Sequence, residues 1–375
     1  MKVLLIFSLF LALGAAIGNA QAAAKSRPTL ALEGKSAQLT VDLGGGSIAD
    51  FHLNSQPLNP LSWDSWSFSP NPDSTPPPDP RSMGHFLCLD RWGPASDAEI
   101  KNGMGWHGEA TRVQWEVLSK AKKQDGAIRA QLGATLPMGG LSVVRSIALD
   151  SDQSFFVVTE AVTNNNKLGR LYNMVQHPTI GPPFLDEHTL VDANGRKGFM
   201  QSSPMPNPEE PAVFWPQALN RDGETVNLRH LTDNADPGVV SYVIDEEYGW
   251  VTASSPTTGL LIGYIWKTAE YPWFDAWRHA AKGKPFARGL EFGTSGLHQP
   301  FPILVKKGKI FDRPIYGYLD AGETTAKSYA TFLFKIPDDY QGVASLSYAD
   351  GKLTLHERDG KPERDLVMEV GQLFP

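Results

Sequence analysis

The chain has 375 residues, with 34 lysines and arginines against 41 aspartates and glutamates, and a formal net charge of −7 at pH 7. This mildly acidic balance lacks the basic footprint of a nucleic-acid-binding protein, so we expect no nucleic-acid partner. The single cysteine, Cys88, cannot form an internal disulfide, and the fold must therefore be stabilised by its core. We interpret Cys88, next to Phe86 and Leu87, as a small buried apolar residue rather than a nucleophile.

The N-terminal residues are typical of a signal peptide. Lys2 supplies a positive charge, residues 3–17 form an apolar run that is short for a bilayer span, and small residues follow. We expect residues 1–24 to be the signal peptide and residues 25–375 to be one exported domain, periplasmic or extracellular. A retained membrane anchor is the alternative. No later segment is long and apolar enough to cross a membrane, so we expect no membrane association after cleavage.

The rest of the chain follows the pattern of β-strands. In residues 112–118, Val113, Trp115 and Val117 alternate with polar residues, as expected for a half-buried strand. Turn residues separate such segments, as in the glycine run at 44–46 and the asparagine run at 164–166. Strands are predicted at residues 30–41, 47–53, 112–118, 127–132, 141–149, 154–162, 239–244, 249–254, 259–266, 310–319, 327–335 and 352–357.

Helical periodicity is scarce. The one modest helix candidate, residues 268–281, contains Pro272, which argues against a helix. Residues 69–80 are rich in proline and are predicted to form a surface loop rather than a domain linker, because strands of the same style resume after it. The sequence therefore predicts an all-β fold, a large antiparallel sandwich in one domain.

Two histidines lie in segments that suit a binding cleft. His177 directly precedes Pro178, which favours an extended backbone, and an imidazole titrates near neutral pH, where it can donate or accept a proton. His107 lies between Trp106 and Gly108, and glycines here allow a ligand to approach the backbone closely. A hydrogen-bonded structural histidine is the alternative at each position.

Two later segments combine aromatic and charged residues. Residues 271–279 include Trp273 and Asp275, a mixture that fits sugar recognition but is equally typical of an aromatic core corner. Further on, Glu291 stands between Leu290 and Phe292, so on a strand its side chain points away from both. If that face lines a cavity, desolvation raises the pKa of the carboxyl and makes it a better base at neutral pH. A solvent-facing glutamate paired with Arg288 is the alternative.

Several common site motifs are absent from the sequence. No spacing of His, Cys and Asp matches a zinc site, and there is no Gly-x-Ser-x-Gly elbow, phosphate-binding loop or dinucleotide fingerprint. We therefore expect neither a metal nor an organic cofactor.

The order of these segments resembles the aldose 1-epimerase (galactose mutarotase) superfamily. The similar pieces are a glycine-rich first hairpin (44–53), a His-Gly…Arg…Trp segment (105–115), a strand meander (141–162), a histidine before a turn (172–181), a late glutamate strand (287–294) and a Leu-x-x-Gly-Glu turn (319–323). Together they extend over most of residues 38–335. The resemblance implies a large β-supersandwich.

The resemblance also implies roles for individual residues. His177 matches the histidine proposed as general acid, and Glu291 matches the glutamate proposed as general base. His107 matches a sugar-binding histidine, Arg112 the nearby arginine, and Asp275 a substrate-binding aspartate. With Trp273 and Arg288 as further candidate binding residues, the implied partner is a free sugar or oligosaccharide whose anomers are interconverted.

Other functions stay open at this stage. The same fold serves carbohydrate-binding proteins without turnover, and also glycan lyases or hydrolases, for which Asp90 and Glu109 are a candidate carboxylate pair. Arginines at 91, 112, 278 and 288 leave room for an anionic sugar such as a uronic acid.

Overall fold

The computed structural model describes residues 27–74 and 79–374. The predicted signal peptide, residues 1–24, lies outside these described residues. Within them, no helix has the length and apolar character needed to cross a bilayer.

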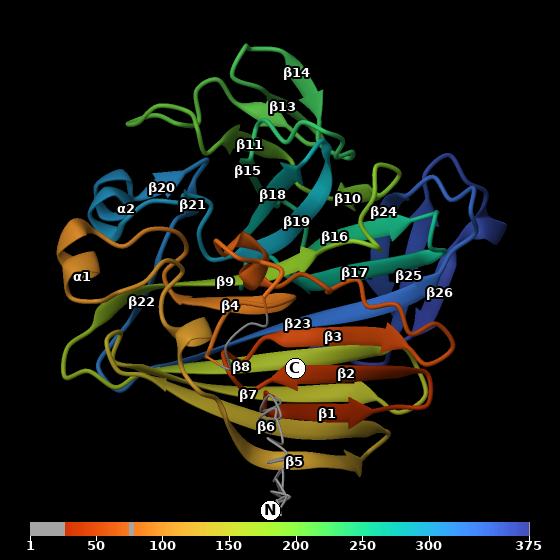
Figure 1. Cartoon of the computed structure of the whole chain (residues 1–375), viewed down its shortest axis with the longest axis horizontal. Coiled ribbons are helices and arrows are strands. Elements are labelled where there is room, and N and C mark those ends of the chain that lie inside the picture. Colours follow the sequence, from red (N-terminus) through yellow and green to blue (C-terminus); the bar gives the residue numbers. More distant parts are fainter. Residues whose placement is uncertain (1–26, 75–78, 375) are drawn as a thin grey trace, which may run out of the picture.

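Two large sheets dominate the molecule (Figure 1). The eleven-stranded sheet has the order β1 (Thr29–Glu33), β2 (Ala37–Asp42), β3 (Ile48–Leu53), β4 (His85–Asp90), β9 (Arg170–Ile180), β19 (Lys284–Gly293), β18 (Trp273–Ala281), β15 (Val239–Val243), β11 (Lys197–Met200) and β12 (Val213–Phe214), and β22 (Gly317–Leu319) pairs with the start of β9. The eight-stranded sheet has the order β10 (Leu190–Ala193), β16 (Tyr248–Ser255), β17 (Leu260–Lys267), β23 (Thr324–Lys335), β8 (Phe155–Asn164), β7 (Leu141–Asp150), β6 (Ala127–Leu136) and β5 (Glu116–Gln124).

The main core forms where the inner faces of the two sheets meet. Along β19, Leu290 and Phe292 point into this core while Glu291 points to the opposite face, as strand alternation predicts. Phe156 of β8 contacts Phe51 of β3 edge to face, with ring centroids 4.7 Å apart. The predicted all-β, antiparallel sandwich is therefore confirmed.

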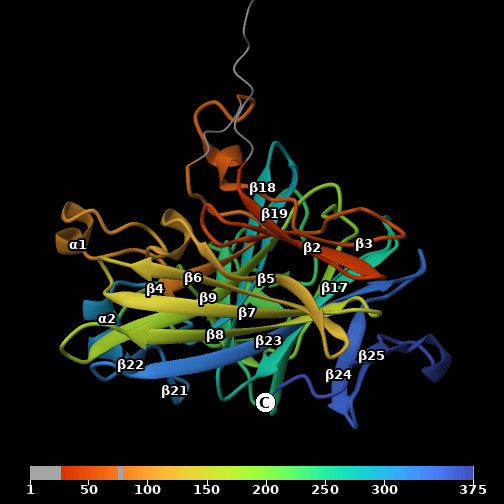
Figure 2. The same ribbon diagram turned by 90° about the horizontal axis from the view of Figure 1, so that it is seen from below.

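A small C-terminal sheet lies beside the two large ones. It consists of β24 (Val343–Ala349), β25 (Lys352–Glu357) and β26 (Leu366–Glu369), and Figure 2 shows β24 and β25 set to one side of the large sheets. The buried carboxylate of Asp192, on β10, holds the small sheet against the eight-stranded sheet. It accepts hydrogen bonds from Arg229, Arg358 and the backbone N–H of Val343.

Short elements and loops cover the outer face of the eleven-stranded sheet. They include α1 (Asp97–Lys101), α2 (Phe301–Lys307), the 3₁₀ turns η1 (Ser65–Phe68) and η2 (Ala110–Arg112), and the hairpin of β20 (Lys309–Ile310) with β21 (Arg313–Pro314). Elsewhere lie the hairpin of β13 (Gln217–Leu219) with β14 (Thr225–Asn227) and the turn η3 (Pro362–Arg364).

Two of the predicted strands need adjustment. Residues 112–118 do not form one strand, because Ala110–Arg112 is the turn η2 and β5 begins only at Glu116. Residues 310–319 form three short strands rather than one, because turns interrupt the segment. The weak helix candidate at 268–281 is a turn followed by β18, in agreement with the argument from Pro272.

Candidate active site

A row of side chains crosses the outer face of the eleven-stranded sheet. Ser241 of β15 pairs with Asp275 of β18, and Asp275 pairs with Glu291 of β19. The register of β19 with β9 places Glu291 opposite His177, and His177 in turn pairs with Phe86 of β4. Paired residues of antiparallel strands project to the same face, so segments far apart in sequence deliver this row to one place.

The centre of the row is a direct contact between His177 and Glu291. The His177 Nε2 atom lies 3.2 Å from Glu291 Oε1, and the Trp92 indole N–H donates to Glu291 Oε2 at 2.7 Å. On the other side of the imidazole, Nδ1 lies 3.0 Å from the Thr179 hydroxyl oxygen. Phe86 stacks on the imidazole with centroids 4.1 Å apart. Both polar side chains are therefore held in place by several neighbours.

The contacts of the Thr179 hydroxyl favour one tautomer of His177. The Thr179 hydroxyl donates to the backbone carbonyl of His177, so its oxygen accepts the Nδ1 proton of the ring. The Nε2 lone pair then faces Glu291. This arrangement favours a protonated Glu291 carboxyl that donates to His177.

Burial favours the same protonation state. Loss of solvent raises the pKa of Glu291 well above its usual value, and the neighbouring charge of Asp275 raises it further against the opposing Trp92 hydrogen bond. Loss of solvent also lowers the pKa of His177 to about 3. The pair therefore holds one shared proton near neutral pH, in a neutral rather than an ionic form.

His107 is held beside this pair in a left-handed backbone conformation. Its φ is 62°, and Gly108 follows with φ of 78°, where a Cβ would overlap the carbonyl of Leu89. The Gly93 N–H lies 3.1 Å from His107 Nδ1, and the Trp106 indole N–H lies 2.8 Å from Nε2. Burial lowers the pKa of His107, with smaller contributions from nearby histidines. His107 is therefore a neutral group at this position.

These groups line one cavity of about 650 Å³. This volume is in the usual range for a small-molecule site. Its walls are mainly aromatic, with a few polar groups between them: Trp63, Ser65, Phe68, Arg81, Ser82, Phe86, Trp92, Trp106, His107, Thr111, Arg112, His177, Val239, Trp277, Glu291 and His298. Aromatic faces with sparse hydrogen-bonding groups suit the alternating apolar and hydroxyl faces of a sugar ring.

The structure brings together four of the residues singled out from the sequence. His107, Arg112, His177 and Glu291 all line the cavity, although they come from three distant segments. Asp275 is corrected from this set: it is completely buried beside Glu291 and does not line the cavity, so it reaches a ligand only through Glu291.

Two further placements are also corrections. Trp273 shares the outer face of β18, but it lies under α2 in an apolar cluster with Leu297 and Leu304, and its indole N–H donates to a backbone carbonyl. Arg288 lies three positions from Glu291 and therefore on the opposite face of β19, where it donates to the carbonyls of Leu228 and Arg229. The alternative pairing of Glu291 with Arg288 is wrong for the same reason.

Several lining residues were not found from the sequence. Trp92 and His298 have ring centroids 4.6 Å apart, and Trp277 contacts the ring of His177 at 5.7 Å. Trp277 could have been chosen, because it lies in the same aromatic segment as Trp273. The segments around Trp92 and His298 are irregular, and no local pattern shows which way their side chains point.

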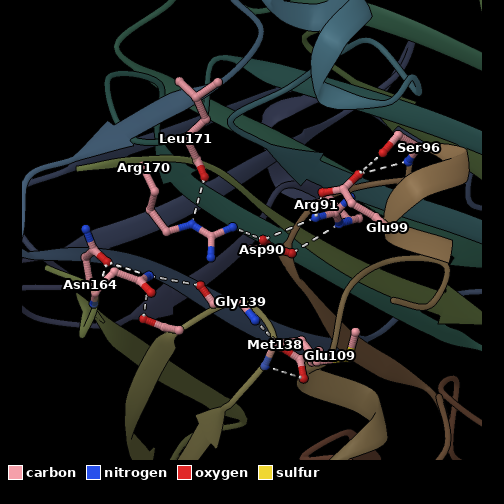
Figure 3. Close-up of polar contacts among 12 residues, drawn as sticks. Asp90, Arg91, Ser96, Glu99, Glu109, Met138, Gly139, Asn164, Arg170 and Leu171 are labelled. Carbon is pink, nitrogen blue, oxygen red and sulfur yellow. Dashed lines mark hydrogen bonds and ion pairs between the residues drawn. The ribbon is translucent and has the colours of Figure 1, made fainter. Parts of the chain in front are cut away.

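The alternative carboxylate pair, Asp90 and Glu109, is engaged elsewhere (Figure 3). Asp90 is ion-paired with Arg91 and Arg170. Glu109 accepts hydrogen bonds from the backbone N–H groups of Met138 at 3.1 Å and Gly139 at 2.6 Å. Neither carboxylate lines the cavity, and both have structural partners.

No cluster suited to a metal ion occurs in the described ranges, 27–74 and 79–374.

Solved structures share this architecture. A galactose mutarotase related enzyme from Lactobacillus acidophilus matches over 83% of this chain and 99% of its own, with a TM-score of 0.57 and 12% identity. The chain has the galactose mutarotase-like fold. A galactose mutarotase-like protein from Lactobacillus casei matches 82% of this chain and 100% of its own (TM-score 0.57, 14% identity). An Escherichia coli K12 protein provisionally assigned as an aldose 1-epimerase matches 83% of this chain and 100% of its own (TM-score 0.54, 14% identity).

No protein-family model matches the sequence, and no curated protein matches it either. The similarity to the mutarotase-like structures is therefore one of fold, as the sequence resemblance implied.

Proposed function

We propose that this chain is an exported aldose 1-epimerase-like enzyme that interconverts the anomers of a free sugar. The observation that carries the proposal is the contact of His177 Nε2 with Glu291 Oε1 at 3.2 Å, among aromatic walls. Ring opening needs one group that removes a proton and one that supplies a proton, and this pair offers both within a single cavity. The N-terminal signal-like sequence supports export.

The first requirement is a shift of the shared proton. Before a sugar binds, the proton resides on Glu291, because burial of the two side chains disfavours both charges. A bound sugar brings hydroxyl groups that hydrogen-bond to the charged forms. They stabilise the ionic form, in which Glu291 is a carboxylate and His177 an imidazolium.

The chemical step then consists of two proton transfers. Glu291 removes the proton of the C1 hydroxyl, and His177 donates the Nε2 proton to the ring oxygen. The bond between C1 and the ring oxygen breaks with its electron pair on that oxygen, and C1 becomes an aldehyde. After rotation about the C1–C2 bond, the hydroxyl adds to the other face of the carbonyl and both protons return. Phe86, Trp92 and Thr179 keep the two catalytic side chains oriented.

Anomer exchange on a panel of free sugars tests the proposal directly. Purified protein is added to freshly dissolved single anomers, and the approach to equilibrium is followed by polarimetry and NMR, with the spontaneous rate subtracted. We expect faster equilibration with at least one sugar. If every sugar equilibrates at the spontaneous rate although sugar binding is detected, the protein is a carbohydrate-binding protein without turnover.

A glycan-cleaving activity is the other outcome to separate. Incubation with oligosaccharides, followed by an assay for new reducing ends, would reveal it. We expect no such ends, because Asp90 and Glu109 are held by structural partners outside the cavity.

A further inference from the structure

The charge of the cavity differs from that of the whole chain. The chain carries a net charge of −7, yet the lining residues include two arginines and a single carboxyl, Glu291. Burial raises the Glu291 pKa and lowers those of His107, His177 and His298, so these four groups add no net charge near neutral pH. The charge of the cavity is therefore set by Arg81 and Arg112.

Only one of the two arginines has a matching acid. Arg81 binds Asp64 through two parallel contacts of 2.8 Å, Nε with Oδ1 and Nη2 with Oδ2. Arg112, by contrast, has neither a hydrogen bond nor an ion pair from its side chain within the part of the chain that the structure describes. The cavity thus carries one positive charge that no carboxylate balances.

The guanidinium of Arg112 also has a defined position. It ends η2, and its guanidinium lies against Gly105 so closely that a Cβ at that position would overlap it. Arg112 and the neighbouring Trp106 are exposed, whereas His177 and Glu291 are buried. The guanidinium therefore lies at the solvent end of the cavity, and the reacting pair lies at its inner end.

The other arginines considered from the sequence do not share this property. Arg91 is paired with Asp90 and Glu99, Arg278 donates to the carbonyl of Asn234, and Arg288 lies on the opposite face of β19. Of these four arginines, Arg112 is the one whose side chain is available to bind a ligand in the cavity.

We propose that the sugar taken by this cavity bears an oxyanion, a carboxylate or a sulfate or phosphate ester, and that Arg112 binds this group at the cavity mouth. The inference rests on the proposed sugar chemistry at His177 and Glu291. A guanidinium presents paired N–H donors that match the oxygens of such anions, and charge-assisted bonds of this kind are stronger than those to neutral hydroxyls.

Matched pairs of sugars test the inference. Glucose is compared with glucuronate, glucose 6-sulfate and glucose 6-phosphate, and galactose with galacturonate. Dissociation constants come from NMR titration, so the result does not depend on turnover. We expect at least one anionic member to bind on the order of 10-fold to 100-fold more tightly than its neutral partner, with the preference falling as salt is added. The three glucose derivatives show which oxyanion is preferred.

Variants then assign the preference to Arg112. In Arg112→Gln the ratio of anionic to neutral affinity should fall by about 10-fold to 100-fold, and in Arg112→Lys by less. Gly105→Ala retains the charge but displaces the guanidinium, and should also lower the ratio. Arg129→Gln, an exposed change on β6, is the matched control for the loss of one positive charge, and Gly238→Ala, where an added methyl meets nothing within 4 Å, is the control for the added carbon. Both should keep the wild-type ratio.

The outcomes separate this inference from the proposed reaction. Equal binding of neutral and anionic sugars, or an unchanged ratio in Arg112→Gln, would overturn the inference even if neutral anomers are interconverted. An Arg112-dependent preference without any anomer exchange would support the inference and overturn the proposed reaction. Absence of binding to every sugar would overturn both.

Discussion

The paired strands β4 and β9 lie beside two polar clusters whose buried carboxyl groups, Asp90 on β4 and Glu291 on the neighbouring β19, have different partners. Toward one end of the pair, Asp90 is flanked by the guanidinium groups of Arg91 and Arg170. Toward the other end, Glu291 is as deeply buried as Asp90, at 1% exposure, but its polar contacts are with His177 and the Trp92 indole N–H rather than with a guanidinium. Because two guanidinium groups compensate its charge, Asp90 has a structural role. Burial, with a smaller contribution from the charge of Asp275, raises the pKa of Glu291, and buried carboxyls of this kind in a cavity are typical of reactive sites.

The largest expected effect in this comparison is on turnover. Glu291→Gln should reduce anomer exchange about 10³-fold, because the base is lost while a glutamine can still accept the Trp92 hydrogen bond. Exchange NMR measures the rate, and NMR titration should show sugar affinity within a few fold of wild type. Glu116→Gln, exposed on β5, serves as the control. Wild-type turnover in Glu291→Gln would rule out the assigned role.

A mutation in the cluster of Asp90, Arg91 and Arg170 should change the stability of the protein rather than its turnover. Asp90→Asn removes the buried carboxylate shared by Arg91 and Arg170 and leaves Arg91 with Glu99 alone, and we expect a loss of about 3 kcal/mol in the free energy of unfolding. Urea denaturation measures this loss. The folded variant should retain its turnover rate. A large drop in turnover at unchanged stability would show that the Asp90 cluster is not merely structural.

A smaller effect is expected from the carboxyl behind the site. Burial raises the pKa of Asp275 itself well above its usual range, and once this carboxyl is ionised its charge raises the pKa of Glu291 further, so Asp275→Asn should lower the pKa of Glu291. The shared proton of the pair would then be lost at a lower pH, and the alkaline limb of the activity profile should move toward neutral pH. The pH dependence of kcat/KM for the two proteins measures the shift. An effect on sugar affinity alone would instead indicate that Asp275 contacts the ligand.

The smallest effect concerns acid pH in the wild-type protein. An ordinary histidine gains a proton as the pH falls through about 6.5, which would add a second proton to the pair. Burial lowers the pKa of His177 to about 3, so the singly protonated pair persists well below neutral pH. We therefore expect kcat/KM to stay level between pH 7 and pH 5 after subtraction of the spontaneous rate. An acid limb centred near pH 6.5 would contradict this protonation state.

Much of the fold could be predicted because strands leave a local signature. Alternating side chains and turn residues located most strands of the eight-stranded sheet, but the predicted ranges did not include β4, β9, β18 and β19, which carry the site. The order of segments indicated the sandwich before any contact was known. The same alternation places Glu291 away from Leu290 and Phe292, and applied to Arg288 it would have removed that residue from the site. The error at Arg288 was therefore avoidable from the sequence.

The choice of Trp273 instead of Trp277 as a binding residue could not have been corrected from the sequence. Both lie on the same face of β18, and α2 covers Trp273 while Trp277 remains open to the cavity. Which part of a strand is covered depends on segments packed from elsewhere. Trp92 and His298 belong to such irregular segments, which carry no periodic pattern.

The sequence by itself determined the all-β class, most strands of the eight-stranded sheet and the candidacy of His107, His177 and Glu291, because period-two patterning and segment order are properties of the chain. Only the tertiary structure decided which charges are compensated. It paired Asp90 with Arg91 and Arg170, left Arg112 without a partner among the described residues, and placed His177 against Glu291. The reason is physical: desolvation and ion pairing depend on distances in space, which no local pattern encodes.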